Sequence, residues 1–380
     1  MNPASRDAVR TLDEIVICDM GGVRIHNGNA GSTGDSLFLA QLYFKRGFFA
    51  SHNTDDTQRF AEFVYTNKEK IKYVTIAGGD GTLQVVLTEL FQAFGDEKMP
   101  DIYILPCGSE NKVAMELDYK RGDSAHWDSL VFSRESLLVS KINVTPMKLE
   151  VDDSRQLAPM YYFDFGFGAV AKYLAKLYDV TIDDAQPNGI IPKKMSSTWR
   201  RKLAVTRQTW HDAKTNTGIM APIEIEELVV ELKDGSTKRY SNAKSTAGMV
   251  STMRDLMYDL HLFYKAQYGG LAHALFSESE EASLYSRRYA ILASRLTESS
   301  FLPFMPDSFP LGEGFFDDLV KSIEITFKRP EIVQMAGELI KGTKIKLTAM
   351  PEKAVTIFSY QPLPQLYNRT IPEQRHKYAR

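Results

Sequence analysis

The chain has 380 residues, of which 43% are hydrophobic and 25% are charged, and its formal net charge at pH 7 is −2. This length suffices for two domains, and the composition is ordinary for a globular protein. The charge gives no support to nucleic-acid binding, which needs a basic surface, and two cysteines form neither a disulfide framework nor a zinc motif.

The N-terminal stretch "MNPASRDAVRTLDE" has no apolar h-region, so we expect no Sec-type signal peptide. The longest apolar runs are also too short to span a bilayer. Two cysteines inside or beside apolar runs fit a reducing compartment. We therefore expect a cytoplasmic protein whose contact with membranes, if any, is peripheral.

The first part of the chain alternates strand and helix signals. Strands are predicted at 14–18, 47–51 and 73–77, helices at 36–45 and 54–70, and a loop, "HNGNAGSTGD", at 26–35. After residue 82, apolar residues follow one helical face at Leu83, Val86, Leu87, Leu90, Phe91 and Phe94, and Gly95 is placed as a stop. A strand at 102–106 and a second glycine turn, "PCGSENK", come next. This rhythm predicts an α/β domain with a parallel sheet and helices on both sides.

The pattern changes near residue 141. Alternating, β-rich stretches follow, and Lys233-Asp234-Gly235-Ser236 predicts a hairpin turn. We therefore predict a nucleotide-binding α/β domain at 1–141, a mainly antiparallel second domain at 142–358 with a helical insertion at about 246–298, and an extended tail at 359–380.

The stretch "TIAGGDGTLQ" (75–84) places three glycines directly after a predicted strand. Glycine loses the most entropy on ordering, so the cluster indicates either a tight turn or a backbone that approaches a ligand. Amide groups at a helix N-terminus suit an anion such as phosphate. Neither the dinucleotide motif nor the P-loop fits, because Gln84 replaces the third glycine and no Walker lysine follows. Asp80 suits a loop that holds Mg²⁺ or that is fixed by hydrogen bonds.

Gly78-Gly79-Asp80-Gly81-Thr82 resembles the GGDGT signature of diacylglycerol kinases, sphingosine kinases and ceramide kinases, which more distant NAD kinases and phosphofructokinases share. Further stretches resemble lipid-kinase motifs in the same order: "HNGNAGS" (26–32), "LPCGSENKVAMEL" (105–117), "FGFGAVAKYL" (165–174), "MPDSFPLGEGFFDDL" (305–319) and "AGELIKGTKIKLTAMPEKAVTIF" (336–358). The resemblance implies a phosphofructokinase-like three-layer nucleotide domain, an antiparallel β-sandwich that contacts the lipid, and ATP bound in the cleft between them.

The resemblance also implies residue roles. The triphosphate of ATP would contact Gly78, Gly79, Gly81 and Thr82, with Asn27, Ser32, Ser109 and Asn111 completing the nucleotide pocket. Asp80 would orient the loop, directly or through Mg²⁺. Glu338 would act as general base for the lipid hydroxyl or position a metal. A glutamate at a turn is more commonly a surface carboxylate, and the resemblance to the family segment favours the functional role.

Three acidic positions of the family pattern are lost, because this chain has Val85, Lys112 and Ala336 there. Lys112 is a position at which diacylglycerol kinases often have Asp, whereas sphingosine kinases do without it. Besides an ATP- and Mg²⁺-dependent lipid kinase, two alternatives therefore stay open: a nucleotide- or lipid-binding member with weakened catalysis, and a small-molecule kinase of the NAD-kinase type.

The stretch "KKMSSTWRRKLAVTRQTW" (193–210) combines six basic residues with Trp199 and Trp210. Basic side chains next to tryptophans suit an anionic membrane surface, from which a lipid substrate would be reached. The alternative is a solvated helix whose tryptophans pack inward.

Overall fold

The computed structural model describes residues 24–26, 54–71, 73–106, 111–117, 140–151, 157–186, 189–195, 199–215, 217–253, 263, 265–266, 268–278 and 315–359. The chain divides into two compact units, with boundaries after Val144 and after Glu352. The first unit contains the chain before the first boundary and the strand that follows the second boundary. The second unit contains residues 145–352.

The first unit is built on a five-stranded sheet in the order β1-β2-β3-β15-β4. β1, β2, β3 and β15 run parallel, and β4 is antiparallel to β15. Its strands are β1 (Arg24–His26), β2 (Tyr73–Gly78), β3 (Asp101–Pro106), β4 (Ser140–Val144) and β15 (Val355–Ser359), and its helices are α3 (Thr54–Asn67), the 3₁₀ turn η2 (Lys68–Lys70), α4 (Asp80–Phe94) and α5 (Lys112–Glu116). The parallel pairing confirms the predicted α/β class for this part of the chain.

The predicted apolar stripe makes α4 a buried helix. All six apolar residues of the stripe are buried, and Phe94 is followed by Gly95 at φ 56°, whose N–H donates to the carbonyl of Phe91 at 3.0 Å. α4 packs against β2 and α3. The helix therefore holds the end of β2 in place, where the glycine turn lies. The strands predicted at 14–18 and 47–51 and the helix predicted at 36–45 lie outside the described residues.

The second unit is built on a ten-stranded antiparallel sheet, whose main path runs β12-β11-β7-β13-β14-β5-β6. The additional pairing of β12 with β13 closes a ring of strands, because β13 spans 21 residues and pairs with β7 near its end. The strands are β5 (Met147–Val151), β6 (Met160–Tyr162), β7 (Asp164–Gly168), β8 (Ile190–Ile191), β9 (Ile223–Leu232), β10 (Thr237–Ser245), β11 (Ala247–Ser251), β12 (Ala272–Ser277), β13 (Phe315–Met335) and β14 (Glu338–Ala349). The hairpin turn predicted at 233–236 joins β9 to β10, with Gly235 at φ 86°.

Two assignments made from the sequence are wrong. Within the helical insertion predicted at 246–298, β11 and β12 are strands of the main sheet. Both are almost entirely buried, so they lack the polar–apolar alternation that marks a half-exposed strand. The last strand predicted for the second domain, β15, instead pairs with β3 and β4 in the sheet of the first unit. The tail predicted at 359–380 lies, after Ser359, outside the described residues.

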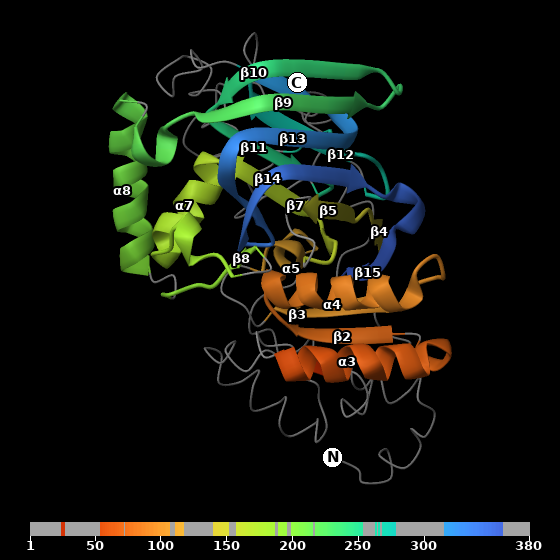
Figure 1. The fold of residues 1–380 in the computed structure, drawn as a ribbon. Helices are drawn as coiled ribbons and strands as arrows, with labels where there is room; N and C mark the ends of the chain where they lie inside the picture. Colours follow the sequence, from red (N-terminus) through yellow and green to blue (C-terminus); the bar gives the residue numbers. More distant parts are fainter. Residues whose placement is uncertain are drawn as a thin grey trace, which may run out of the picture. The chain divides into compact units, whose positions relative to one another are not determined.

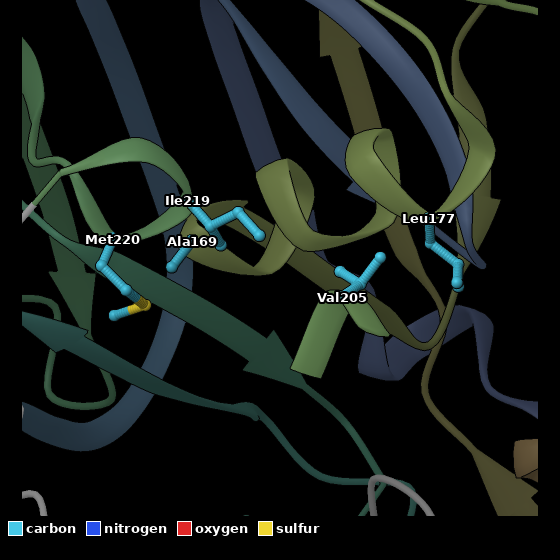
Figure 2. Packing of buried hydrophobic residues seen from close by; sticks show 5 residues of the cluster. All are labelled: Ala169, Leu177, Val205, Ile219 and Met220. Atoms are coloured by element: carbon cyan, nitrogen blue, oxygen red, sulfur yellow. The ribbon is translucent and has the colours of Figure 1, made fainter. Parts of the chain in front are cut away.

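Helices α7 (Ala169–Tyr178) and α8 (Trp199–Thr215) pack side by side in the second unit (Figure 1). Figure 2 shows the buried cluster that joins them, formed by Ala169 and Leu177 of α7, Val205 of α8, and Ile219 and Met220 of the 3₁₀ turn η4 (Gly218–Met220). Two further 3₁₀ turns are η3 (Ile182–Asp184) and η5 (Pro351–Lys353). Within the described ranges, no helix is both long enough and apolar enough to cross a bilayer.

Candidate functional site

The glycine turn joins the end of β2 to the start of α4. A side chain at Gly78 would place its Cβ 2.6 Å from Cβ and Oγ1 of Thr82, which is buried at 4% exposure. Gly78 is therefore required because the first turn of α4 folds back onto the strand end. Gly79, Asp80 and Gly81 are partly exposed. The amide groups and partial positive charge of a helix N-terminus thus lie next to the accessible part of the turn, which suits an anion.

Asp80 connects the glycine turn to the second turn of the first unit. Its Oδ2 accepts a hydrogen bond from the N–H of Lys112 at 3.0 Å, and its Oδ1 accepts one from the N–H of Val113 at 3.4 Å. Both donors lie in the first turn of α5, where helix amides lack partners inside the helix. Asp80 therefore fixes the position of α5 relative to α4.

Asn111 precedes α5 and adopts the left-handed conformation at φ 55° and ψ 45°, with its side chain buried at 5% exposure. Asparagine is among the few non-glycine residues that adopt this conformation readily. Asn111 thus lies directly before the amides that Asp80 holds. The structure therefore brings Gly78, Gly79, Asp80, Gly81, Thr82 and Asn111 together at one end of the parallel strands. The predicted residues Asn27, Ser32 and Ser109 lie outside the described residues.

Glu338 begins β14, directly after a two-residue hairpin turn. The turn residues Ala336 and Gly337 have φ values of 55° and 77°, the combination of a type I′ turn. The N–H of Ala336 donates to Oδ1 of Asp164 at 3.1 Å, and the N–H of Gly337 donates to Oε1 of Gln334 at 3.0 Å. Buried polar side chains therefore fix the turn on both sides, and they place Glu338 reproducibly.

The carboxylate of Glu338 is 9% exposed and forms an ion pair with Lys193, with 2.6 Å between Oε1 and Nζ. Lys193 belongs to the basic stretch at 193–210, for which the sequence predicts a membrane surface, and no sequence pattern indicates a role for Asp164. Neither contact could be found from local patterns, because the residues of each pair are 145 and 172 positions apart. The ion pair holds the carboxylate of Glu338 in one place.

The positions that lose an acidic residue have other structural uses here. Ala336 forms the hairpin turn, and the N–H of Lys112 binds Asp80. Next to Val85, Gln84 is buried and donates from Nε2 to Oγ1 of Thr88 at 3.0 Å. In the part of the chain that the structure describes, no three His, Cys, Asp or Glu side chains come close enough to hold a metal ion together.

Comparison with known proteins agrees with this geometry. Residues 23–139 match the family model of the diacylglycerol kinase catalytic domain. A diacylglycerol kinase from Bacillus anthracis str. Sterne has the same fold at 13% sequence identity, with a TM-score of 0.51 over 90% of this chain and 96% of that chain. A second structure from the same organism, provisionally assigned as a diacylglycerol kinase, gives 14% identity and a TM-score of 0.56 over 90% and 95%. No curated protein matches the sequence.

The family match includes the glycine turn, Asp80 and the second turn at Asn111, and the structural likeness extends over both units. The fold shared with these bacterial proteins is a mixed α/β fold rich in strands. Residues 23–139 of this chain are therefore similar in sequence to diacylglycerol kinase catalytic domains, and the chain as a whole is similar in fold to bacterial proteins of that description.

Proposed function

We propose that the chain is an ATP-dependent lipid kinase, which transfers the γ-phosphoryl group to a hydroxyl of a diacylglycerol or a sphingoid base. The observation that carries this proposal is the glycine turn between β2 and α4, whose Asp80 is tied to the first turn of α5 within the range that is similar to diacylglycerol kinase catalytic domains. Phosphoryl transfer depends on positioning and charge neutralisation more than on covalent chemistry. A rigid turn of backbone amides supports that task.

The proposed roles divide between the two units. In the first unit the turn holds the triphosphate through Gly78, Gly79, Gly81 and Thr82. Four further residues complete the nucleotide pocket: Asn27, Ser32, Ser109 and Asn111. In the second unit Glu338 accepts the proton of the lipid hydroxyl. The hydroxyl oxygen bonds to the γ-phosphorus, the bond between that phosphorus and the β–γ bridging oxygen breaks, and ADP leaves. We assign the first unit to the phosphofructokinase-like class of nucleotide domains and the second to lipid binding.

Asp80 fits Mg²⁺ as a single ligand. Kinase sites commonly hold this ion with one or two carboxylates together with substrate phosphates and water. Asp80 is partly exposed at the turn, and a carboxylate is the side-chain type that this ion prefers. When bound, Mg²⁺ would neutralise charge on the transferred phosphoryl group.

The alternative, a nucleotide- or lipid-binding member with weakened catalysis, is favoured by the acidic positions that are now Val85, Lys112 and Ala336. Purified protein incubated with γ-labelled ATP, Mg²⁺ and mixed micelles of diacylglycerol, sphingosine or ceramide separates the possibilities, with NAD as a parallel acceptor. Label in one lipid supports the proposal. Nucleotide binding without transfer supports the binding protein, and label on NAD alone supports a soluble kinase.

A lipid substrate requires access from a membrane, and α8 supports a peripheral contact. Leu203 on α8 and Met195 just before it are 41% and 46% exposed, and Arg200 and Arg207 are exposed on the same helix. By helical spacing, Leu203 and Arg207 lie on the side of α8 opposite the buried Val205. We assign this face of α8 to contact with anionic lipid.

Binding to phosphatidylcholine vesicles with and without phosphatidylserine tests the α8 assignment. Each basic residue near an anionic surface contributes about 1 kcal/mol, so Arg200→Ala/Arg207→Ala is expected to weaken binding to the anionic vesicles roughly 30-fold. The matched control is Arg239→Ala/Arg329→Ala, which removes two exposed arginines from the β-sheet. Equal binding by both double variants contradicts the assignment of the face.

A further inference from the structure

The pairing of β8 with β14 determines where Lys193 lies. Ile190 and Ile191 of β8 pair with Ile340 and Leu339 of β14. The chain then leaves β8 and reaches Lys193 two residues later, beside the first residue of β14, which is Glu338. Backbone pairing thus brings two residues that are 145 positions apart into one place.

The contact between Lys193 and Glu338 differs from an ordinary surface ion pair. The Nζ–Oε1 distance is 2.6 Å, and the two side chains are 28% and 9% exposed. Nζ of Lys193 also lies 5.0 Å from the ring centroid of Tyr178 on α7, which adds a cation–π contact. A carboxylate this buried is costly unless a cation or hydrogen bonds compensate its charge. Lys193 therefore compensates the charge of the Glu338 carboxylate and restricts its rotamer.

The ion pair leaves one oxygen of Glu338 for a ligand. Oε1 is bound to Lys193, whereas Oε2 makes no hydrogen bond to another of the described residues. The side chain of Glu338 keeps 9% of its surface exposed. An ionised carboxylate with one fixed and one accessible oxygen is suited to accept a proton from a hydroxyl.

We propose that Lys193 is a positioning residue for phosphoryl transfer: it fixes Oε1 of Glu338 so that Oε2 faces the acceptor hydroxyl. The inference rests on the proposed function, because it takes Glu338 to be the general base. Lys193 itself contacts no substrate in this account. Its effect is on the orientation and charge of the base, and misplacement of a catalytic group by about 1 Å can lower a rate roughly 100-fold.

The chain offers a matched control in the next residue. Lys194 carries the same charge and also forms an ion pair, with 2.7 Å between its Nζ and Oδ1 of Asp184 in η3. This pair is more exposed, at 52% for Lys194 and 21% for Asp184. Solvent-exposed pairs contribute little to structure. A change that affects Lys193 but not Lys194 therefore reports on Glu338 rather than on the charge of the segment.

The test compares kcat and the KM for ATP in the full chain, using the lipid that the wild type labels. Lys193→Met is expected to lower kcat by about tenfold or more while the KM for ATP changes less than about twofold, because the nucleotide contacts are intact. Lys193→Arg is expected to recover most of kcat, since it restores the cation. Lys194→Met is expected to match the wild type. If thermal unfolding shows that Lys193→Met is not folded, Lys193→Gln replaces it, with the same expected loss because the charge is gone.

Glu338→Gln separates the inference from the function on which it rests. Wild-type kcat in this variant would show that Glu338 is not the base, and the assigned role of Glu338 would then fail together with the inference. Loss of kcat in Glu338→Gln combined with wild-type kcat in folded Lys193→Met would overturn the inference alone. Equal losses in Lys193→Met and Lys194→Met, or no recovery in a folded Lys193→Arg, would overturn it as well.

Discussion

At the scale of single residues, the contact with Thr82 explains why a glycine ends β2. Any larger residue at position 78 would place its Cβ 2.6 Å from Cβ of Thr82. We expect Gly78→Ala to lower the free energy of unfolding by about 1–3 kcal/mol, as overpacking does. This loss of stability is expected to be smaller when Thr82→Gly removes the opposing Cβ. Urea unfolding of the wild type, the two single variants and the double variant measures the difference in a double-mutant cycle. Strictly additive effects would show that the contact does not require the glycine.

Ala336 is a residue in a conformation that its side chain disfavours. At φ 55°, it occupies the first position of the turn before Glu338, where a left-handed conformation costs a non-glycine residue about 1–2 kcal/mol. Ala336→Gly is therefore expected to raise the free energy of unfolding by roughly 1 kcal/mol. The control is Ala349→Gly at the end of β14, which has no positive φ and is expected to lose stability. If both variants lose the same free energy of unfolding, the backbone of Ala336 is not strained.

The sequence was most informative about residues whose role is local. The apolar stripe of α4 and its stop at Gly95 could be predicted, because they follow from the spacing within one helix. The partners of Asp80 and Glu338 could not, because Lys112, Asp164 and Lys193 reach their positions through pairing of distant strands or through a second turn. The sequence could therefore indicate which residues belong to the candidate site, whereas it could not indicate which residues they contact.

At the scale of elements, β12 and β13 enclose a buried charged cluster. Nε2 of His273 lies 2.7 Å from Oδ1 of Asp317, and Nζ of Lys265 lies 3.2 Å from the same oxygen. Burial lowers the pKa of His273 below its ordinary value of 6.5, although Asp317 opposes this shift. As pH falls, the unfolded chain takes up the proton first, so the stability that neutral His273 contributes is present above about pH 6.5 and is lost below it.

We therefore expect the unfolding temperature of the wild type to fall as pH is lowered from about 7 to about 5, and the fall to be smaller in His273→Gln. Differential scanning calorimetry across this range measures both slopes. His211→Gln changes an exposed histidine on α8 and is expected to keep the wild-type slope. An unchanged slope in His273→Gln would exclude His273 as the source of the pH dependence.

The type of an element, helix or strand, could be predicted where its residues show a clear apolar pattern. α3, α4, β2 and β3 carry the expected periodicity, and the structure confirms them. β11 and β12 are buried on both faces, so their small and apolar residues could not be distinguished from a helix by pattern. β15 has an ordinary strand pattern, and only its pairing with β3 and β4 reveals that it belongs to the first sheet.

At the scale of the whole molecule, the α/β class and the later β-rich half followed from the change of pattern near residue 141, whereas the return of the chain to the first sheet did not. Each unit carries one half of the proposed chemistry. The glycine turn with Asp80 lies in the first, and Glu338 with Lys193 lies in the second.

The most direct test is transfer of label from γ-labelled ATP to lipid by the wild type and by Asp80→Asn and Glu338→Gln, which keep the side-chain shapes. The account predicts Mg²⁺-dependent labelling of a diacylglycerol or a sphingoid base by the wild type. It also predicts a loss of about 100-fold or more in each variant, since each removes a charge that positions reacting groups. A wild type that labels none of these lipids, or labelling that persists undiminished in both variants, would contradict it.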